Sequence, residues 1–415
     1  MGEINRAWLD AAPGAVELAI GLVGVMALWL GLMRVLRDAG LMNAIGRALA
    51  PAMRRLFPDV PADHPAMSAM ILNLAANILG LGNAATPFGL KAMRELSTLS
   101  TRPGVATNAM ATFLALNTSG VAVMPLGVIA VRASMGSSDP AGIFLPSVLA
   151  TFCSTLVAVA VVKLLQHRPR YALERFPSDD SGEDAADGSI ADSIEGIGEA
   201  EDIARHRPAG DRLRGWAAIA AIVCLAALAA RHFAGGEDSL ESLRDLNSNW
   251  LMPALMAGIV LFGFSRRVPV YESFIKGARE GFDIAVTIIP FLVAILFSVA
   301  MFRASGALEA LTSVLNLATS QIGFPAEALP MALIRPLSGS GAFGVMTATM
   351  ESYGPDSFVG YLVSIMNGST ETTFYVLALY FGSVKVRAAR HTVAACLCAD
   401  FAGVLAALFW ARVFF

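Results

Sequence analysis

Two charged residues lie in segments that are otherwise apolar, and their surroundings indicate binding chemistry. Arg335 precedes Pro336 and the segment Ser338-Gly-Ser-Gly341, and Glu371 lies in Asn367-Gly-Ser-Thr-Glu-Thr-Thr373. A guanidinium beside hydroxyls and free backbone amides can hold a carboxylate, a phosphate or a polarised carbonyl. Inside a membrane such a charge is costly unless it is paired or hydrated. Arg335 and Glu371 therefore line a site or form an internal ion pair, and such a pair can itself line a site.

Uncharged polar residues interrupt apolar segments at equivalent places in the two halves of the chain. One interruption is Asn117-Thr-Ser-Gly120, and the other is the segment that contains Glu371. Unwound polar helix centres of this kind coordinate a cation or hydrogen-bond a solute, although hydrogen bonding between helices is the simpler alternative. Because the two halves match, we favour a binding site. A similar polar stretch at 73–86 contains Asn73, Asn77, Asn83 and Thr86. We predict solute-binding residues in this stretch, in the two interruptions and around Arg335. They are Asn77, Asn83, Asn117, Thr118, Ser119, Arg335, Ser338, Ser340, Asn367, Ser369, Thr370 and Glu371.

Three acids are candidates for binding a coupling ion, which would be Na⁺ or H⁺. They are Glu371 and the matched pair Glu17 and Asp283, near the starts of two apolar runs. For the matched pair, a structural charge favoured by the helix dipole is the alternative. We expect no metal and no other cofactor, because the four cysteines and five histidines lack the spacing of a metal site. The spans also carry no paired carboxylates and no nucleophile with a base, so we expect no enzyme.

The composition indicates a membrane protein rather than a soluble one. Of the 415 residues, 56% are hydrophobic and 15% are charged, and the mean hydropathy is +0.62. The 37 glycines and 20 prolines are scattered among apolar runs and predict interrupted helices. Lipid tolerates such interruptions only where protein or a water-filled cavity covers the exposed backbone. No basic patch interleaved with aromatic residues suggests binding to nucleic acid.

The hydropathy pattern predicts spanning helices, which need about 20 apolar residues each. Two other apolar stretches, 66–99 and 325–351, are too long for one helix and too short for two, with small or polar residues in the middle. Each fits a re-entrant helical hairpin whose tip stops near the middle of the membrane. The predicted spans are roughly 14–36, 106–131, 142–165, 214–233, 249–265, 282–302, 357–383 and 391–413.

The chain also resembles itself, which predicts a duplication. Glu17 and Gly40 are matched 266 positions later by Asp283 and Gly306, and the Asn117 cluster is matched 250 positions later by the Asn367 cluster. The preference of Lys and Arg for the cytoplasm places 23 of the 30 inside and gives the two units opposite orientations. The predicted fold is an all-α polytopic membrane protein of two inverted repeats, with re-entrant helical hairpins and interrupted transmembrane helices.

Four regions follow from this organisation. Residues 166–214 hold 12 of the 33 acidic residues but 7 of the 30 Lys and Arg, so this stretch has a net charge of −5. Such a composition predicts a disordered linker. The predicted regions are a first repeat at 1–165, an acidic cytoplasmic linker at 166–213, two connecting transmembrane helices at 214–265 and a second repeat at 266–415.

The polar segments resemble known families. The stretch from Asn73 to Leu96, which includes Asn-Ile-Leu-Gly-Leu-Gly-Asn, resembles the spore maturation protein A family. Arg335-Pro-Leu-Ser-Gly-Ser-Gly-Ala-Phe-Gly344 and Asn367-Gly-Ser-Thr-Glu-Thr-Thr-Phe-Tyr375 resemble the spore maturation protein B family, so the chain resembles a natural fusion of the two. The resemblance implies a nucleoside-recognition or gate domain related to concentrative nucleoside transporters. It places solute contacts on Asn77, Asn83, Asn117, Arg335, Ser338, Asn367 and Glu371.

These observations predict a secondary transporter of the bacterial inner (cytoplasmic) membrane, multi-pass and with its linker in the cytoplasm. It would carry a small polar solute, either nucleoside-like or a small anionic or zwitterionic metabolite, by ion-coupled alternating access. The expected partners are the lipid bilayer and the solute, with no nucleic acid, and the chain could form a homodimer. The alternative function is a non-transporting membrane scaffold for envelope or spore-cortex maturation, with the acidic linker as its docking element.

Overall fold

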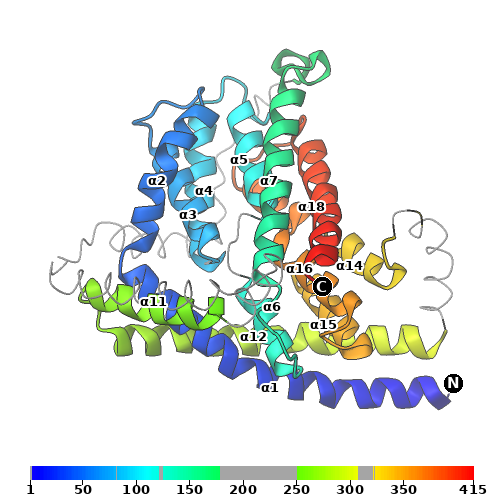
Figure 1. Ribbon diagram of the computed structural model, residues 1–415. Helices are drawn as coiled ribbons and strands as arrows, with labels where there is room; N and C mark the ends of the chain where they lie inside the picture. The colour runs from blue at the N-terminus through cyan, green and yellow to red at the C-terminus, as the bar shows by residue number, and fades with distance from the viewer. Residues whose placement is uncertain (1, 81, 121–124, 178–249, 307–320, 322) are drawn as a thin grey trace, which may run out of the picture.

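The protein is an all-helical membrane protein, as expected, in a computed structural model that describes residues 2–80, 82–120, 125–177, 250–306, 321 and 323–415 (Figure 1). These residues contain no strand, and their one β-bridge joins Val105 and Ala388. In chain order the α-helices are α1 (Gly2–Asp38), α2 (Leu41–Leu56), α3 (Pro65–Ile78), α4 (Gly82–Thr98), α5 (Asn108–Thr118), α6 (Leu126–Ser134), α7 (Phe144–Gln166), α11 (Leu251–Ser265), α12 (Val270–Ala304), α14 (Leu329–Ile334), α15 (Gly339–Tyr353), α16 (Phe358–Ser369), α17 (Thr373–Ser383) and α18 (Thr392–Phe414).

Both predicted re-entrant hairpins are present. The first, α3–α4, turns at Gly80, whose φ of 70° suits glycine. The second, α14–α15, turns before Ser338, which caps α15 by accepting a hydrogen bond from the N–H of Gly341 at 3.0 Å. With 14 and 15 residues, α3 and α15 are each about 21–23 Å long, too short to cross about 30 Å of hydrocarbon. The hairpin tips therefore end inside the protein (Figure 1).

The two polar clusters interrupt two helices, as predicted. α5 ends at Thr118, and the chain resumes as α6 after Pro125. α16 ends at Ser369, Thr370 is extended, and α17 begins at Thr373. Ser and Thr hydroxyls offer backbone groups alternative partners at these points, which favours the end of a helix. The predicted spans 106–131 and 357–383 are therefore broken helices.

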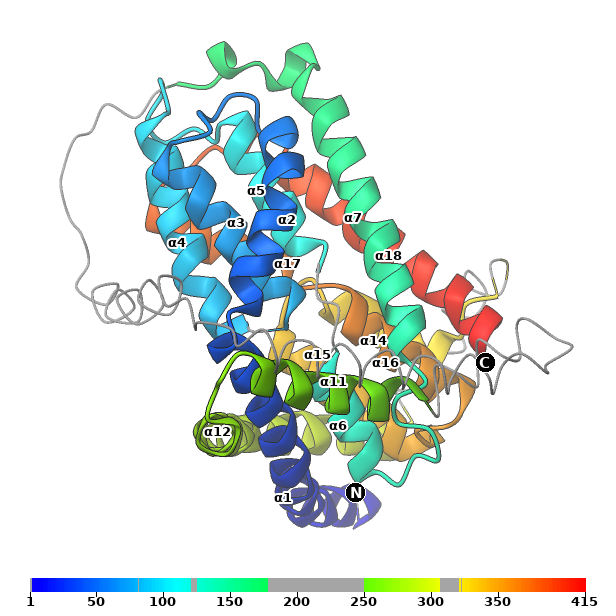
Figure 2. The same cartoon turned by 60° about the vertical axis from the view of Figure 1, so that its left-hand side comes forward.

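The two halves of the chain have the same order of elements in opposite orientations. In the first half the hairpin α3–α4 is followed by the broken helix α5–α6 and by α7, and in the second half α14–α15 is followed by α16–α17 and α18. α7 and α18 pack together, and in Figure 1 α7 rises while α18 descends. In Figure 2, α5 and α17 lie above α6 and α16. This arrangement confirms the inverted repeats.

The long helices α1 and α12, which contain the predicted spans 14–36 and 282–302, pack against each other across one end of the bundle (Figures 1 and 2). Small residues make this antiparallel contact close. A Cβ on Gly277 would lie 2.9 Å from the Cα of Gly31, and a Cβ on Gly281 would lie 2.8 Å from the Cα of Ala27. Small residues at a four-residue spacing allow such close packing of helices in membranes.

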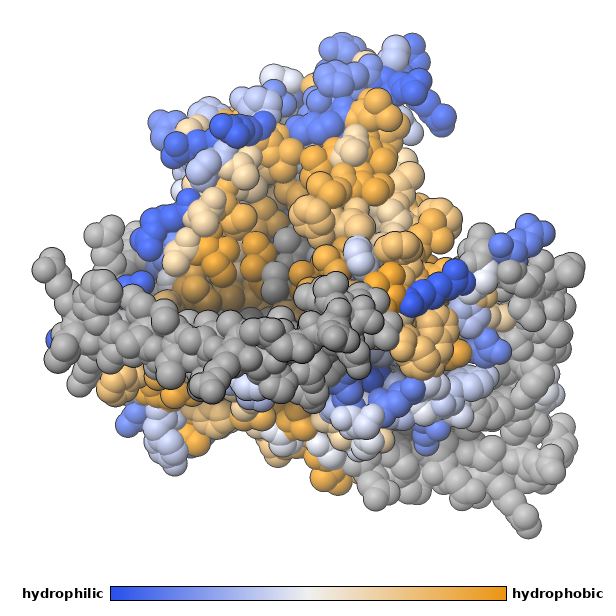
Figure 3. Space-filling model, viewed as in Figure 1, coloured by the Kyte–Doolittle hydropathy of each residue, from blue (hydrophilic) through white to orange (hydrophobic). Residues whose placement is uncertain are grey.

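The outward faces of α7 and α18 are apolar. These are the described helices that are long and apolar enough to cross a membrane. Figure 3 shows an apolar band on this side of the molecule below a hydrophilic end. Large apolar side chains exposed to water would be unfavourable, so this face is suited to lipid. The exposed apolar residues on these two helices include Phe152, Leu156, Leu164, Phe401, Leu405 and Phe409.

The acidic linker is described only at its beginning. After α7, residues Pro169–Tyr171 and Leu173–Arg175 form two short 3-10 helices. Arg102 donates a hydrogen bond to the carbonyl of Phe176 at 3.0 Å, so this segment is held against the first repeat. Residues 178–249, which include most of the predicted linker and the predicted span 214–233, lie outside the described residues.

An arginine ties the two repeats together at each end of the bundle. Arg132 of α6 donates to the carbonyl of Pro355 at 2.5 Å and to Asp356 at 3.0 Å, just before α16. Arg390, just before α18, donates to the carbonyl of Ala106 at 2.9 Å and to Asn108 at 3.1 Å, where α5 begins. Each arginine therefore holds the start of the other repeat's broken helix. We call these contacts the Arg132 clasp and the Arg390 clasp.

The Arg132 clasp makes stability depend on pH. The Asp356 carboxylate also accepts hydrogen bonds from Ser137 and Ser138 at 2.5–2.7 Å. Burial alone would raise the pKa of Asp356, but these hydrogen bonds and the charge of Arg132 outweigh it and lower the pKa below its ordinary value. The stabilisation is therefore present above the ordinary pKa of about 4 and is lost as the pH falls through the lowered value.

We expect Asp356→Asn to lower the stability at neutral pH by about 1 kcal/mol, a modest value because Asp356 is partly exposed. The midpoint of thermal unfolding, measured over a range of pH, should differ between variant and wild type at neutral pH and converge in acid. Asp63→Asn, which changes an exposed acid, is the matched control and should behave as the wild type. Equal midpoints for Asp356→Asn and wild type at every pH would contradict the role of the carboxylate.

Candidate functional site

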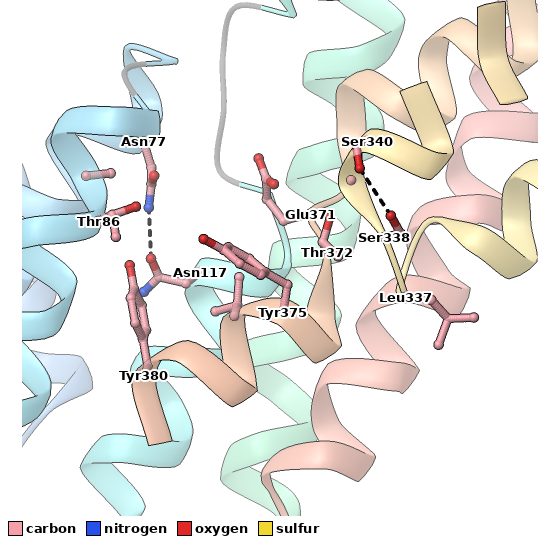
Figure 4. Close-up of a pocket in the computed structure, with 13 residues that line it drawn as sticks. Asn77, Thr86, Asn117, Leu337, Ser338, Ser340, Glu371, Thr372, Tyr375 and Tyr380 are labelled. Atoms are coloured by element: carbon pink, nitrogen blue, oxygen red, sulfur yellow. Dashed lines mark hydrogen bonds between the residues drawn. The ribbon is translucent and has the colours of Figure 1, made fainter. Parts of the chain in front are cut away.

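A cavity of about 460 Å³ lies where the two hairpins meet the broken helices (Figure 4). This volume suits a small organic solute. α3–α4 and α5 form one wall, and the turn before α15 and the first turns of α17 form the other. The side chain of Glu371 is 48% exposed, so solvent reaches the cavity. The lining residues are Asn77, Ala85, Thr86, Asn117, Leu337, Ser338, Gly339, Ser340, Glu371, Thr372, Tyr375, Val376 and Tyr380.

A chain of side-chain amides forms the polar wall contributed by the first repeat. Asn77 donates to the Oδ1 of Asn117 at 2.9 Å and to the Oδ1 of Asn73 at 3.4 Å. Asn73 in turn donates to the carbonyl of Ala85, across the hairpin, at 2.8 Å and to the hydroxyl of Tyr380 at 3.3 Å. These bonds fix the hairpin to both α5 and α17. Among the described residues no donor reaches the Oδ1 of Asn77, which leaves this oxygen available to a solute.

The two helix breaks touch each other beside the cavity. The backbone N–H of Glu371 donates to the carbonyl of Thr118 at 3.2 Å. Gly120 packs so closely against the other break that a Cβ at this position would lie 2.9 Å from the Cα of Thr370. Its φ of 67° is a second reason for glycine here. The two interruptions therefore form one structural unit.

Arg335 lies behind the cavity wall and does not line the cavity. Its buried guanidinium donates to the carbonyl of Thr370, to the carbonyl of Asn367 at 3.2 Å and to the hydroxyl of Thr372 at 3.3 Å. The end of α16 leaves such carbonyls without a partner inside the helix. Glu371 lies 3.8 Å from the guanidinium, on the cavity side. Arg335 is thus a positioning residue for the break, and its ion pair borders the cavity through Glu371.

The cavity has a definite chemical character. Glu371 is the one side chain among its thirteen lining residues that has a formal charge at neutral pH. Tyr375 and Tyr380 add aromatic rings with hydroxyl groups, and the other polar lining groups are amides and hydroxyls. A planar polar ring could stack on a tyrosine and pair with the amides. Arg335 lies behind Glu371, whose negative charge offsets the positive charge of the guanidinium at the cavity. The cavity therefore favours the binding of a neutral or zwitterionic solute over that of an anion.

The predicted site residues fall into three groups. Those that line the cavity are Asn77, Asn117, Ser338, Ser340 and Glu371. Those that surround the breaks without lining it are Thr118, Ser119, Arg335, Asn367, Ser369 and Thr370. Among the remaining candidates, Asp283 is exposed on α12 and does not line the cavity, and the side chains of Asn83 and Glu17 lie outside the described residues.

Tyr375, Tyr380 and Asp400 lie at or near the site and were not among the residues predicted from the sequence. Tyr375 and Tyr380 line the cavity from α17, and their positions shortly after the second interruption were the available signal. Asp400 is buried in α18 and accepts a hydrogen bond from Thr373 at 2.7 Å. It is an acid within the predicted span 391–413, so the reasoning that selected Arg335 would also have selected Asp400.

The chain is similar in sequence to a known family model and to two known proteins. A family model described as nucleoside recognition (gate) matches residues 19–135. Spore maturation protein B of Bacillus subtilis is 48% identical over 164 residues, which are 39% of this chain and 92% of that protein. Spore maturation protein A of the same organism is 42% identical over 166 residues, which are 40% of this chain and 85% of that protein. The chain is therefore similar to both proteins over most of their lengths.

One solved structure aligns with most of the chain, at a low TM-score. It is the crystal structure of the YdaH transporter of Alcanivorax borkumensis, whose topology is described as unusual. The TM-score is 0.37 at 15% identity, and the alignment covers 99% of this chain and 86% of that one.

Arg335→Ala tests whether this residue holds the break. The substitution removes the donor to the buried carbonyl of Thr370 and to the partly buried carbonyl of Asn367, so we expect it to lower the free energy of unfolding by about 3 kcal/mol. Ser340→Ala, which removes a hydroxyl from the cavity wall, is the control and should leave the stability close to that of the wild type. Thermal unfolding of the purified protein, followed by tryptophan fluorescence, measures both. An Arg335→Ala variant as stable as the wild type would show that the break does not depend on the guanidinium.

Proposed function

This chain belongs to the family of spore maturation proteins A and B, and we propose that it is a secondary transporter rather than an enzyme. It would be a multi-pass protein of the bacterial inner membrane, surrounded by lipid, with the linker 166–213 in the cytoplasm. The nucleoside-recognition match supports this proposal because its range, 19–135, includes α3, α4 and α5, which form one wall of the cavity.

The observation that carries the proposal is the position of the cavity. It lies between two re-entrant hairpins and two broken helices that belong to repeats of opposite orientation. Transporters built from inverted repeats bind their solute at this kind of junction, and one repeat moves against the other to open the site to each side in turn. The Arg132 and Arg390 clasps join the repeats at opposite ends, so alternating access would require them to open in turn.

The lining residues favour a nucleoside-like or zwitterionic solute. Tyr375 and Tyr380 offer stacking surfaces, Asn77 and Asn117 offer amide groups, and Glu371 can accept hydrogen bonds from hydroxyl or ammonium groups. Among the solutes predicted from the sequence, which are nucleoside-like, anionic or zwitterionic, the small anionic metabolite is the least favoured, because Arg335 does not line the cavity. Uphill transport would be coupled to Na⁺ or H⁺, with Glu371 the acid nearest to the solute.

Reconstitution into liposomes tests the proposal directly. The purified protein should take up at least one member of a panel of nucleosides, dipeptides and anionic metabolites under an inward Na⁺ or H⁺ gradient. Empty liposomes give the background. If folded protein moves no compound of the panel under either gradient, we would abandon the proposed transport.

Glu371→Gln should reduce uptake of any transported solute by about tenfold or more, because the variant loses the charged acceptor of the cavity but keeps its shape. Thermal unfolding should change little, since Glu371 is partly exposed and its ion pair is 3.8 Å long. Asp63→Asn again serves as the control acid. Unchanged uptake by Glu371→Gln would remove Glu371 from the solute site.

The alternative function is a scaffold, which the names of the two relatives also allow. The linker would then be the docking element for envelope or cortex enzymes. Deletion of residues 176–204 separates the alternatives, because it leaves every helix that lines the cavity intact. Loss of biological function in the cell with solute uptake preserved would favour the scaffold, and retention of both would favour the transporter.

A further inference from the structure

Asp400 is a buried acid that neither the cavity nor the clasps use. It lies in the interior of α18, its residue is 5% exposed, and it does not line the cavity. The residues before it, Ala-Ala-Cys-Leu-Cys-Ala, are apolar. An acid in such a segment is costly to keep charged, and where it occurs in a membrane protein it usually has a function.

The two oxygens of the Asp400 carboxyl group have different surroundings. Oδ2 accepts a hydrogen bond from the hydroxyl of Thr373 at 2.7 Å, and Thr373 is the first residue of α17 after the break. Oδ1 is buried and has no hydrogen-bond partner among the described residues. In an apolar interior a carboxylate with one partner costs more to bury than the neutral carboxylic acid, because the neutral form carries no charge.

The positive charge of Arg335 opposes the effect of burial and favours the carboxylate form of Asp400. α18 packs against α5, α7, α16 and α17. On these helices and the neighbouring hairpin, the described groups that interact electrostatically with Asp400 are Arg335 and, one turn earlier on α18, the thiol of Cys396. α5 has no acid or base. The helices that pack against α18 carry other titratable groups, which form no hydrogen bond with Asp400. These groups are Cys153 and Lys163 of α7, Tyr361 of α16, and Tyr375 and Tyr380 of α17.

We propose that Asp400 binds and releases the coupling proton. Burial favours the neutral acid, while Arg335 and the N-terminal end of α17 favour the carboxylate, so opposing effects act on the two protonation states of Asp400. A sodium ion would need several oxygen ligands, whereas one proton on Oδ1, which has no hydrogen-bond partner among the described residues, is enough to neutralise the charge of Asp400. This inference rests on the proposed transport function and identifies the ion that drives it.

Arg335 links Asp400 to the cavity. Its guanidinium lies 3.8 Å from the carboxylate of Glu371 and holds the carbonyls of the second break, and its positive charge also acts through space on Asp400. When the proton leaves Asp400 for water, the O–H bond breaks and one negative charge remains on the carboxylate. Arg335 keeps its own proton and is then attracted by two carboxylates instead of one. Deprotonation of Asp400 is therefore expected to weaken the hold of Arg335 on Glu371 at the solute site.

Infrared difference spectroscopy tests the proton site without any solute. Full-length protein in lipid vesicles should show the C=O band of a protonated carboxylic acid, and the band should disappear as the pH is raised. The component of this band that comes from Asp400 should be missing from the pH difference spectrum of Asp400→Asn and present in that of Asp63→Asn. If the pH difference spectra of wild type and Asp400→Asn are the same, the proposal is wrong. If Asp400→Asn does not fold, Thr373→Val replaces it, because loss of the hydrogen bond to Oδ2 should shift the same band.

Transport assays with uridine as the probe test the coupling. A gradient of about one pH unit should let the wild type accumulate uridine up to about tenfold, because the gradient corresponds to a tenfold ratio of proton activity. Asp400→Asn should exchange uridine across the membrane without a gradient but lose this accumulation, and Asp63→Asn should keep both. Accumulation by Asp400→Asn, or accumulation that depends on sodium instead of protons, would overturn the assignment. Absence of uridine exchange in the wild type would count against uridine as a solute, while the infrared titration still decides the proton site.

Discussion

A helix that ends inside a membrane leaves backbone carbonyls that must find donors, because lipid offers none. The structure meets this constraint at both breaks with donors from elsewhere in the fold. The carbonyl of Thr118 accepts the N–H of Glu371 from the opposite repeat, and the carbonyl of Asn367 accepts from the buried guanidinium of Arg335. These hydrogen bonds hold the polar groups of the two breaks in fixed positions, and the cavity is the space that remains between them.

The same constraint explains why each hairpin enters the protein and turns back. The tip of the first hairpin reaches the break of its own repeat through Asn77 and Asn117, and the second reaches its break through Arg335 and Asn367. The two repeats therefore use the same plan with different chemistry, an amide pair in one and a guanidinium in the other. The first repeat leaves an amide oxygen facing the cavity, whereas the second leaves the Glu371 carboxylate.

The sequence was sufficient to predict the architecture, because the signals for hairpins, breaks and inversion depend on local polarity and on the distribution of charge. The same local signals found Asn77, Asn117 and Glu371, which line the cavity. They could not tell which polar residues face the cavity and which satisfy backbone groups. The residue type and sequence surroundings of Arg335 are typical of a ligand-binding residue. Whether its side chain points into the cavity, however, depends on contacts between segments distant in sequence. The pairing of α1 with α12 depends likewise on long-range packing of small residues, which a hydropathy pattern does not specify.

The clasps at the two ends of the bundle differ in chemistry. Arg132 is paired with a carboxylate, and Asp356 is partly exposed to solvent. Among the described acceptors of Arg390 there are only carbonyl and amide oxygens. Dissolved salt screens an exposed ion pair but has little effect on a hydrogen bond to a neutral group. High ionic strength on the Arg132 side of the membrane therefore weakens the Arg132 clasp but not the Arg390 clasp. The relative strength of the two clasps thus depends on the salt concentration at each membrane face.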